Sequence, residues 1–371
     1  MENKTIMLVA NDTTFTYKLR KEILDGFVKK GYRVIVVAKK INFNYELESI
    51  GCKIIDLNFE RTSTNPISDI RLLKQIFKIL KSEKPDIVFS NSIKPNVYFG
   101  FACNKLNIKF VPNITGLGRA LEYPGILQKI SILLYKIGMK GSDIILFQNE
   151  FNKNFFLENK IIGDLQKFEI LPGSGVNLSE YKKLQYPQSE EIVFLFIARI
   201  RKEKGIDLVI NAAKELGSKY DNLTFNVCGL CEDSFYLEKF KELEKEGYFK
   251  YYGEQKSLTL FYESSNCIIH PTYYPEGMSN VLLEAGAHAR PIITTDRPGC
   301  KEIVIDGYNG YMIETRNQLQ LNQAIEKFIN LSYAQKQLMG ENGRQNVEDN
   351  FDRESVVSMY LEISERLLQS N

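Results

Sequence analysis

Short runs of β-branched and aromatic residues alternate with amphipathic stretches along the whole chain. Apolar residues recur at spacings of three and four, the periodicity of a helix, in residues 18–30, 67–81 and 126–139. The apolar runs between them, which predict strands, cover residues 6–10, 34–37, 54–57, 87–89, 110–111 and 144–147. Strands and helices that alternate in this way predict a parallel sheet covered by helices.

This pattern stops at residues 171–175, and the polar, aperiodic segment 181–190 predicts an interdomain linker. A second set of apolar runs follows, at residues 192–198, 223–227, 267–270, 291–295 and 310–313. A chain of 371 residues is long enough for two domains. We therefore predict an α/β protein of two Rossmann-like doubly wound domains, 1–172 and 173–351, facing a central cleft. Ligands of such sheets bind outside the carboxyl ends of the strands.

The charge of the chain is close to balanced, with 48 basic and 46 acidic residues. This balance, without an aromatic-interleaved basic patch, gives no support to nucleic-acid binding. The two halves differ, however: residues 1–172 carry 26 basic and 17 acidic side chains, so the first half is basic and the rest is acidic. The apolar start is too short for a signal peptide and no run of about 18 apolar residues occurs, so we expect a cytoplasmic protein.

Six cysteines are too few for a disulfide scaffold in a chain of this length. Cys228 and Cys231 form a CxxC pair, but no second pair accompanies them. The strand-like residues before Gly229 favour inert thiols at the end of a strand, and a redox or zinc role is the alternative.

Basic residues follow the apolar run 192–198. Arg199, Lys204 and Gly205 stand where a strand is expected to give way to a helix. A guanidinium fork, an ammonium group and a helix N-terminus together suit a diphosphate. A solvated basic turn is the alternative.

Glu276 and Glu284 are eight residues apart in the second cluster. If Gly277 opens a helix, the two carboxylates lie roughly 12 Å apart by helix rise, too far to share one substrate atom. They suit the two ends of one elongated ligand, with backbone N–H groups facing an anion between them. Two ordinary surface glutamates are the alternative.

A third cluster, residues 296–304, contains a Pro298-Gly299 turn that has a purely structural interpretation as well. The chain has no Asp-x-Asp, zinc-ligand spacing or Walker loop, so no metal site is predicted. A Gly-x-Gly-x-x-Gly segment after the first strand is also missing, which argues against a typical NAD-dependent enzyme.

Together these clusters resemble glycosyltransferase family 4, a group of retaining enzymes with the GT-B fold. The resemblance rests on Glu276 and Glu284, on the segment from Arg199 to Gly205, on Gly229 after a strand and on the turn at 298–302. It implies that Arg199 and Lys204 neutralise the diphosphate of a UDP-sugar donor, that Glu276 binds the hydroxyls of the transferred sugar and that Glu284 holds the ribose. It also implies no cofactor and a final helix, 352–371, that packs on the first domain. The remaining residues expected at the donor are Gly277, Met278, Ser279, Asn280, Gly229 and His270, the last more plausibly structural.

Residues 113–121 of the first half are similar to a segment of enzymes that extend saccharides on undecaprenyl diphosphate, several of which transfer N-acetylgalactosamine. Gly116, Gly118 and Arg119 lie in this segment, and Arg20 matches a basic residue of the first helix in those relatives. Flexible glycines beside an arginine suit a diphosphate acceptor, although an ordinary turn has the same composition.

One departure from the family concerns the loop after the fourth strand. Relatives often carry a histidine there, whereas in this chain Asn91 or Ile93 stands in its place, depending on the alignment. The resemblance therefore leaves open whether a general base acts on the acceptor. Lys94 in the same loop is a candidate acceptor contact, with a plain surface lysine as the alternative.

Residues 126–139 are strongly apolar, with Lys129, Lys136 and Lys140 nearby. A core helix is the commoner explanation of such a stretch. The basic first half favours a second one, in which this helix docks on an anionic membrane surface and the protein is peripheral on the inner face of the cell membrane.

The expected function is therefore a metal-independent, retaining transferase that moves a hexosaminyl group from a UDP-sugar to a lipid-diphosphate-linked saccharide acceptor. A nucleotide-sugar epimerase or hydrolase on the same architecture is one alternative. A non-catalytic protein that binds a sugar nucleotide is the other.

Overall fold

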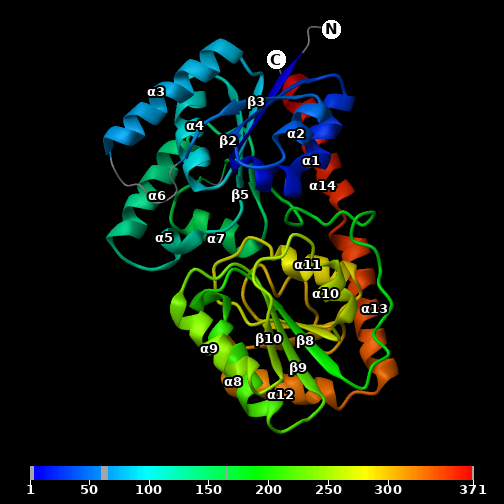
Figure 1. Ribbon diagram of the computed structural model, residues 1–371. Helices are drawn as coiled ribbons and strands as arrows, with labels where there is room; N and C mark the ends of the chain where they lie inside the picture. Colours follow the sequence, from blue (N-terminus) through cyan, green and yellow to red (C-terminus); the bar gives the residue numbers. More distant parts are fainter. Residues whose placement is uncertain (1–3, 60–65, 164, 370–371) are drawn as a thin grey trace. The chain divides into compact units, whose positions relative to one another are not determined.

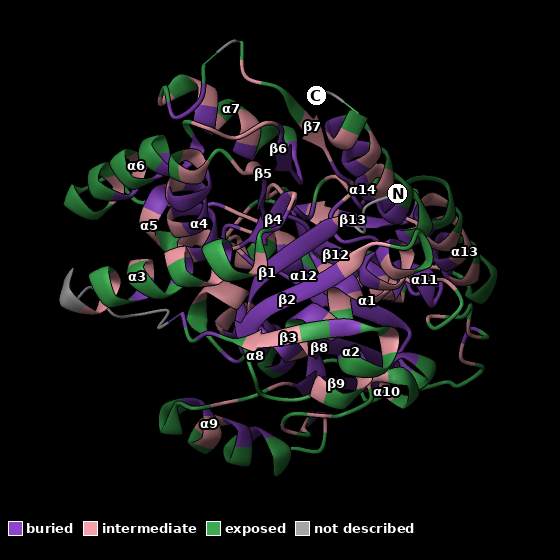
Figure 2. Ribbon diagram, turned by 90° about the horizontal axis from the view of Figure 1, so that it is seen from above, coloured by how far each residue is buried: buried purple, intermediate pink, exposed green. Residues whose placement is uncertain are grey.

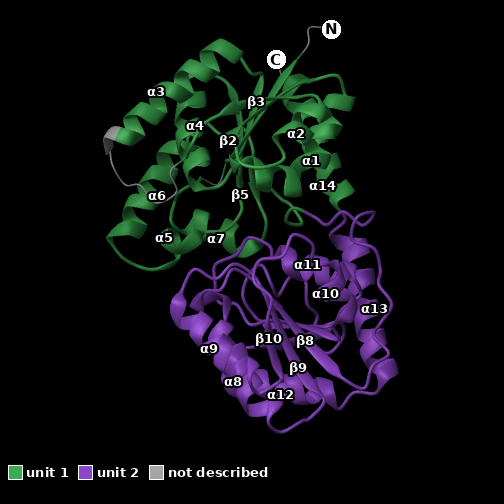
Figure 3. Ribbon diagram, in the orientation of Figure 1, with its two compact units in different colours: residues 1–174, 353–371 green, residues 175–352 purple. Residues whose placement is uncertain are grey.

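The computed structural model describes residues 4–59, 66–163 and 165–369, which divide into two compact units (Figures 1 and 3). Unit 1 comprises residues 1–174 and 353–371, and unit 2 comprises residues 175–352. Each unit is a parallel sheet with helices on both faces, so the predicted doubly wound α/β fold is confirmed. None of the helices within the described ranges is long and apolar enough to cross a membrane.

The sheet of unit 1 has seven strands in the order β3-β2-β1-β4-β5-β6-β7, all pairs parallel. The elements of unit 1 are β1 (Thr5–Asp12), α1 (Thr13–Lys29), β2 (Arg33–Lys39), α2 (Asn44–Ile50), β3 (Cys52–Asp56), α3 (Pro66–Glu83), β4 (Ile87–Asn91), α4 (Ile93–Leu106), β5 (Lys109–Ile114), α5 (Gly118–Glu122), α6 (Ile126–Met139), β6 (Ile145–Phe147), α7 (Glu150–Glu158), β7 (Phe168–Ile170) and α14 (Arg353–Gln369).

Successive residues of the central strands enter opposite halves of the unit 1 core. Met7 and Val9 of β1 pack with α3, α4 and α6, whereas Ile6 and Leu8 pack with α1 and α14. This alternation is the two-residue period of a strand, and burial on both sides explains why the strands read as continuous apolar runs. Figure 2 shows the buried strands between partly exposed helices.

The sheet of unit 2 has six parallel strands in the order β10-β9-β8-β11-β12-β13. The elements of unit 2 are β8 (Ile192–Ile197), the 3₁₀ turn η1 (Lys202–Lys204), α8 (Ile206–Gly217), β9 (Leu223–Cys228), α9 (Ser234–Glu244), β10 (Phe249–Tyr251), α10 (Thr259–Ser264), β11 (Cys267–His270), α11 (Asn280–Ala287), β12 (Ile292–Thr295), β13 (Gly310–Ile313), α12 (Gln318–Ile329) and α13 (Tyr333–Asn350). The strand order reverses beside β8 here and beside β1 in unit 1, and ligands of such sheets bind at that point.

The polar segment 181–190 belongs to unit 2 and does not form the predicted linker. The buried Arg290 guanidinium donates to the carbonyl oxygens of Leu184 and Gln185, the latter at 2.7 Å, and Nδ1 of His288 lies 2.8 Å from the Lys182 carbonyl oxygen. A polar, aperiodic sequence is therefore ordered here by side chains about a hundred residues further along the chain.

Two glycines allow α6 to pack closely on α4. A Cβ atom on Gly138 would lie 2.7 Å from Cα of Val97, and one on Gly100 would lie 2.1 Å from the carbonyl oxygen of Gly138. Tyr135, which is buried on the same side of α6, completes this contact face. The opposite side of α6 faces away from the core.

We expect Gly138→Ala to destabilise unit 1, because the added methyl group overpacks the α4–α6 contact at a typical cost of about 1–3 kcal/mol. This should lower the Tm of unit 1 by roughly 2–4 °C per kcal/mol in a thermal melt. Gly163→Ala is the matched control, because no described atom lies within 4 Å of a Cβ atom there. Equal Tm values for the two variants would contradict the packing argument.

Candidate functional site

Two loops at the carboxyl edge of the unit 2 sheet are held together by backbone contacts. The loop after β8 leads into Gly205, whose φ of 83° and lack of a side chain let it pack on Pro271, where a Cβ atom would lie 2.2 Å from the carbonyl oxygen. The Tyr273 N–H donates to the Glu203 carbonyl oxygen at 2.9 Å. These contacts place the basic loop beside the loop that follows β11.

The Lys204 ammonium group forms an ion pair with the Glu276 carboxylate. Both side chains are about one-fifth exposed, so the pair is shielded but open to solvent on one side. The ammonium group also lies 4.8 Å from the centre of the Tyr274 ring. The sequence predicted Lys204 and Glu276 for one site, and the structure brings them into direct contact. The sequence analysis did not predict that Tyr274 lies beside them.

The Pro298-Gly299 turn packs against Glu276, so it is more than punctuation after a strand. Gly299 has a φ of 89°, and a Cβ atom there would lie 2.9 Å from Cβ of Glu276. Its carbonyl oxygen accepts the Ser279 N–H at 2.8 Å, and its N–H donates to a Glu302 carboxylate oxygen at 2.7 Å. The third sequence cluster therefore supports the second.

Helix α11 begins at Asn280 and not at Gly277, which corrects the predicted helix start. Ser279 is the N-cap, and because its N–H donates to Gly299, the prediction that this amide faces a ligand is wrong. Met278 is buried in the apolar core beneath α11, while Gly277 lies in the preceding loop. The first amides of a helix have no intrahelical acceptor, so those at Asn280 and just after it form the donor set at this edge.

Glu284 lies on α11 and accepts a hydrogen bond from the buried Tyr262 hydroxyl at 3.2 Å. Burial, followed by the nearby Glu284 carboxylate, raises the pKa of Tyr262 well above its usual value, so the hydroxyl stays a donor. Tyr262 thus orients Glu284 from α10, a positioning contact absent from the sequence prediction.

His270 ends β11 and is 1% exposed. Burial, and then the nearby Lys204 charge, lowers its pKa to about 3, so the imidazole is neutral at physiological pH. Within the described ranges neither ring nitrogen has a hydrogen-bond partner, and the ring lies 6.4 Å from that of Phe196 in a stacked arrangement. His270 is therefore a buried core residue, close enough to Lys204 for the ammonium charge to act on its imidazole.

Gly229 and Arg199 lie at the ends of neighbouring strands. Gly229 has a φ of 145°, and a Cβ atom there would lie 1.8 Å from the Ala198 carbonyl oxygen, so only glycine fits. Arg199 follows Ala198 directly and is exposed. Cys228 is buried, and burial raises the pKa of its thiol to about 12. The thiol therefore stays protonated, which agrees with an unreactive cysteine.

In unit 1, Arg20 joins a buried polar cluster at the ends of β4 and β5. Arg20 donates to the Asn91 side-chain oxygen at 3.4 Å, and the Asn113 amide donates to the Tyr360 hydroxyl at 3.0 Å. Burial lowers the pKa of Arg20, while the adjacent Tyr360 hydroxyl opposes that shift. Arg20 is 5% exposed, so it lies in the interior of the unit. The sequence did not predict Tyr360, because it comes from α14, 247 residues after Asn113.

The other predicted acceptor residues lie at two separate places in unit 1, at the start of α4 and around the start of α5. Lys94, on the first turn of α4, forms an ion pair with Asp69 of α3 at 3.6 Å. Gly116 and Gly118 have φ values of 132° and 64°, which only glycine adopts readily, and Arg119 is exposed on the five-residue helix α5. The glycines thus serve the turn after β5, and Lys94 has a structural partner.

The described residues contain no group of three or more His, Cys, Asp and Glu side chains arranged to hold a metal ion. The groups that can stabilise an anion at the unit 2 edge are cationic side chains and backbone amides. Their chemistry suits a phosphate-bearing ligand.

Both halves of the chain match families of glycosyltransferase domains. Residues 179–346 match the family described as glycosyl transferases group 1, and residues 4–149 match the family described as glycosyl transferase 4-like. The fold and these matches together define the class: the chain is a GT-B glycosyltransferase. More narrowly, it combines a glycosyl transferase 4-like domain with a group 1 domain.

Relatives support the class across most of the chain. An N,N'-diacetylbacillosaminyl-diphospho-undecaprenol alpha-1,3-N-acetylgalactosaminyltransferase of Campylobacter jejuni is 23% identical over 95% of this chain and 96% of its own length. A capsular polysaccharide biosynthesis glycosyltransferase of Staphylococcus aureus is 26% identical over 79% and 81%. An uncharacterized glycosyltransferase of Methanocaldococcus jannaschii is 28% identical, over 63% of this chain and only 61% of the relative.

Solved structures share the fold at low sequence identity. A glycosyltransferase from Rickettsia africae has a TM-score of 0.81 with 21% identity, and the two chains cover each other completely. Anabaena HepE in complex with UDP has a TM-score of 0.77 with 15% identity, covering 98% of this chain and 100% of that one.

We expect the stability of unit 2 to fall as the pH drops from about 6.5 toward 3. In this window the imidazole of His270 is neutral in the folded state but takes up a proton on unfolding, which favours the unfolded state. The free energy of unfolding should decrease by about 1.4 kcal/mol per pH unit in this window from His270 alone. Urea unfolding of the wild type and of His270→Gln at pH 7 and at pH 5 measures this difference. His288 is the only other histidine and is unchanged in both proteins. An equal pH dependence in both proteins would contradict the assignment.

Proposed function

We propose that the chain is a retaining, metal-independent glycosyltransferase that moves an N-acetylhexosamine from UDP to a saccharide on undecaprenyl diphosphate, for a surface glycan or capsule. The Lys204–Glu276 pair carries this proposal, since it holds a cation and a carboxylate together at the carboxyl edge of unit 2. The Campylobacter relative, whose name gives an N-acetylgalactosaminyl group and an undecaprenol-linked acceptor, supports the sugar and the lipid. The solved neighbours that hold UDP or UDP-glucose support the donor base.

The roles of the unit 2 residues follow from their charges. Arg199 and Lys204 bind the diphosphate, and the amides at the start of α11 add donors. Glu276 binds hydroxyls of the transferred sugar. When the donor binds, the Lys204 ammonium group exchanges its ion pair with Glu276 for one with the donor phosphate. Glu284, oriented by Tyr262, binds the ribose. His270 lies close to Lys204 and supports this loop from the core.

The chemical step breaks the bond between the sugar C1 and the phosphate oxygen and forms one from C1 to the acceptor oxygen on the same face. The proton of the acceptor hydroxyl goes to the departing phosphate, which becomes the base. Negative charge that grows on the leaving diphosphate is offset by Arg199 and Lys204 without a metal ion. No histidine is needed on the acceptor side, where Asn91 ends β4.

The acceptor belongs to unit 1 in this proposal, through Arg119 and the glycine turn of residues 116–118. Arg20 acts from the interior by fixing the end of β4 through Asn91. Lys94, which forms an ion pair with Asp69, is a further acceptor contact at the start of α4. Because the acceptor is lipid-linked, the enzyme works peripherally on the inner face of the cell membrane.

The donor and acceptor are tested by incubating the protein with UDP-hexoses and UDP-N-acetylhexosamines in EDTA, with and without a lipid-diphosphate monosaccharide. We expect UDP release and an acceptor mass gain of one N-acetylhexosamine, both dependent on the acceptor. Turnover without acceptor would indicate a hydrolase or epimerase. A rise in Tm with a sugar nucleotide but no turnover would indicate a binding protein.

We expect Lys204→Ala to lower kcat by about 100-fold or more, because loss of one charge that stabilises the leaving group typically costs this much. Glu276→Gln should likewise lose most of its transfer activity, since a carboxylate that accepts from sugar hydroxyls becomes an amide. Lys202→Ala is the matched control, because Lys202 lies in the same loop and is exposed. Comparable loss in Lys202→Ala, or full activity in Lys204→Ala, would refute the assigned role.

A further inference from the structure

Helix α6 exposes an apolar ridge on the surface of unit 1. Its side chains Ile126, Leu127, Ile130, Leu133, Leu134 and Ile137 are between 39% and 80% exposed. They recur at helical spacing on the side of α6 that points away from its contact with α4. A contiguous exposed apolar face of this kind marks an interaction surface.

The charged residues of α6 make this face positively charged. The helix contains no acidic residue, and Lys129, Lys136 and the following Lys140 are all exposed along one flank of the ridge. A surface that buried this ridge against another protein core would have to desolvate these lysines as well, whereas at a membrane they meet lipid phosphates.

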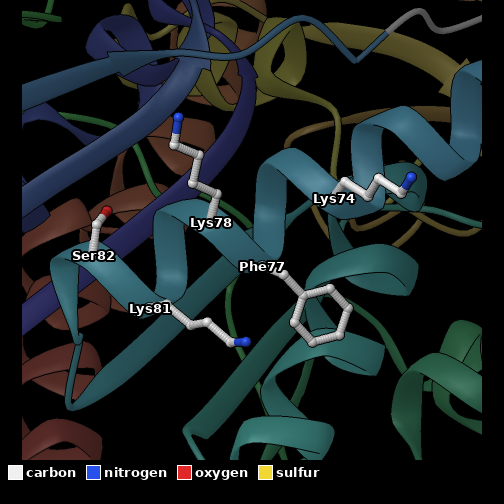
Figure 4. A pocket seen from close by; sticks show the side chains of 5 residues that line it. All are labelled: Lys74, Phe77, Lys78, Lys81 and Ser82. Atoms are coloured by element: carbon white, nitrogen blue, oxygen red, sulfur yellow. The ribbon is translucent and has the colours of Figure 1, made fainter.

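Helix α3 adds a second basic row in the same helix layer, in which α4 packs against both α3 and α6. An open pocket on α3 is lined by Lys74, Phe77, Lys78, Lys81 and Ser82 (Figure 4). The three lysines are exposed. In Figure 2 the ribbons of both α3 and α6 carry long stretches coloured as exposed.

The acidic residues of α3 do not cancel this charge. Asp69 is paired with Lys94, and Glu83 is paired with Arg33 and Lys53. Their partners therefore offset both carboxylates, and the lysine row of α3 keeps its positive potential. Anionic lipid headgroups attract basic residues near the surface within a Debye length.

We infer that the α3–α6 face of unit 1 is a membrane-docking surface, on which the α6 ridge inserts among lipid acyl chains while the α3 lysines bind the phosphates of anionic headgroups. This inference rests on the proposed function, because a lipid-linked acceptor is confined to a membrane. It adds which elements hold the enzyme there and which lipids they select. The two contributions are separable, since the ridge depends on apolar burial and the lysine row depends on salt.

The test is co-sedimentation of the full chain with vesicles of phosphatidylglycerol and phosphatidylcholine, and with vesicles of phosphatidylcholine alone. We expect binding to the anionic vesicles that is weaker at high salt and much weaker on the neutral ones. The variant Ile130→Glu with Leu133→Glu should reduce binding by about tenfold or more, because two carboxylates enter the apolar boundary. Lys74→Gln with Lys78→Gln should reduce it by about tenfold at low salt and by less at high salt.

Matched controls lie in unit 2. Leu260→Glu with Leu319→Glu changes two exposed leucines, which are 75% and 67% exposed, to the same charge, and Lys241→Gln with Lys245→Gln removes two exposed lysines. Both should bind vesicles like the wild type. Wild-type protein that ignores anionic vesicles, or α6 variants that bind them fully, would overturn the inference. So would a wild-type dimer that the α6 variant converts to a monomer, because the ridge would then be covered by a second copy.

Vesicle binding needs neither donor nor acceptor, so its result is independent of the proposed reaction. Activity on a short-chain, water-soluble acceptor should be unchanged in the α6 and α3 variants. A protein that binds anionic vesicles but transfers no sugar refutes the proposed function and leaves the docking surface in place. One that transfers sugar to the soluble acceptor but binds no vesicle refutes the docking surface alone.

Discussion

Parallel pairing of the strands is the constraint on which the rest of the structure depends. It brings the carboxyl ends of the strands in a sheet to one edge, so loops far apart in sequence meet there. In unit 2 this edge joins the loop after β8 to the loop after β11, and the close approach of Gly205 to Pro271 leaves no room for a side chain between them. The contact between Lys204 and Glu276 is a consequence of that backbone approach. Gly299 likewise packs closely on the backbone and Cβ of the Glu276–Gly277 segment, so a second glycine helps to fix the position of Glu276.

The two units use their edges differently. The edge of unit 2 gathers a cation, a carboxylate and helix amides that are partly open to solvent. The corresponding edge of unit 1 is closed by a buried network of Arg20, Asn91, Asn113 and Tyr360, in which the last residue comes from α14. This network joins the two stretches of chain that make up unit 1, and it removes Arg20 from the surface on which a ligand would meet it directly. The exposed basic side chains of unit 1 include Arg119 and the lysines of the outer helices α3 and α6.

Most strands and the helices α1, α3 and α6 could be predicted, because long, periodic apolar patterns leave few alternatives. Helix α13, which is as long as α3, was not predicted. The predicted helix 126–139 coincides with α6, and the strand at 267–270 coincides with β11. Strands β7 and β10 were not predicted, because three residues such as Phe-Glu-Ile or Phe-Lys-Tyr at a sheet edge are too short to show a period. The start of α11 was misplaced by three residues, because the Gly299 carbonyl oxygen, not a local cap, takes the Ser279 amide. The polar segment 181–190 looked like a linker because its order comes from the distant Arg290.

The sequence by itself determined the doubly wound fold, the basic loop after β8 and the identity of the two glutamates. Each of these depends on local composition and residue spacing, which the sequence shows directly. Only the tertiary structure decided that Lys204 reaches Glu276, that Tyr262 orients Glu284 and that His270 lies in the core without a hydrogen-bond partner in the described chain. It also decided which side of α6 is exposed. That helix is apolar on nearly its whole circumference, so its periodicity does not distinguish a buried side from an outer one. The distinction comes from the close glycine contact with α4, which covers one side and leaves the opposite ridge in solvent.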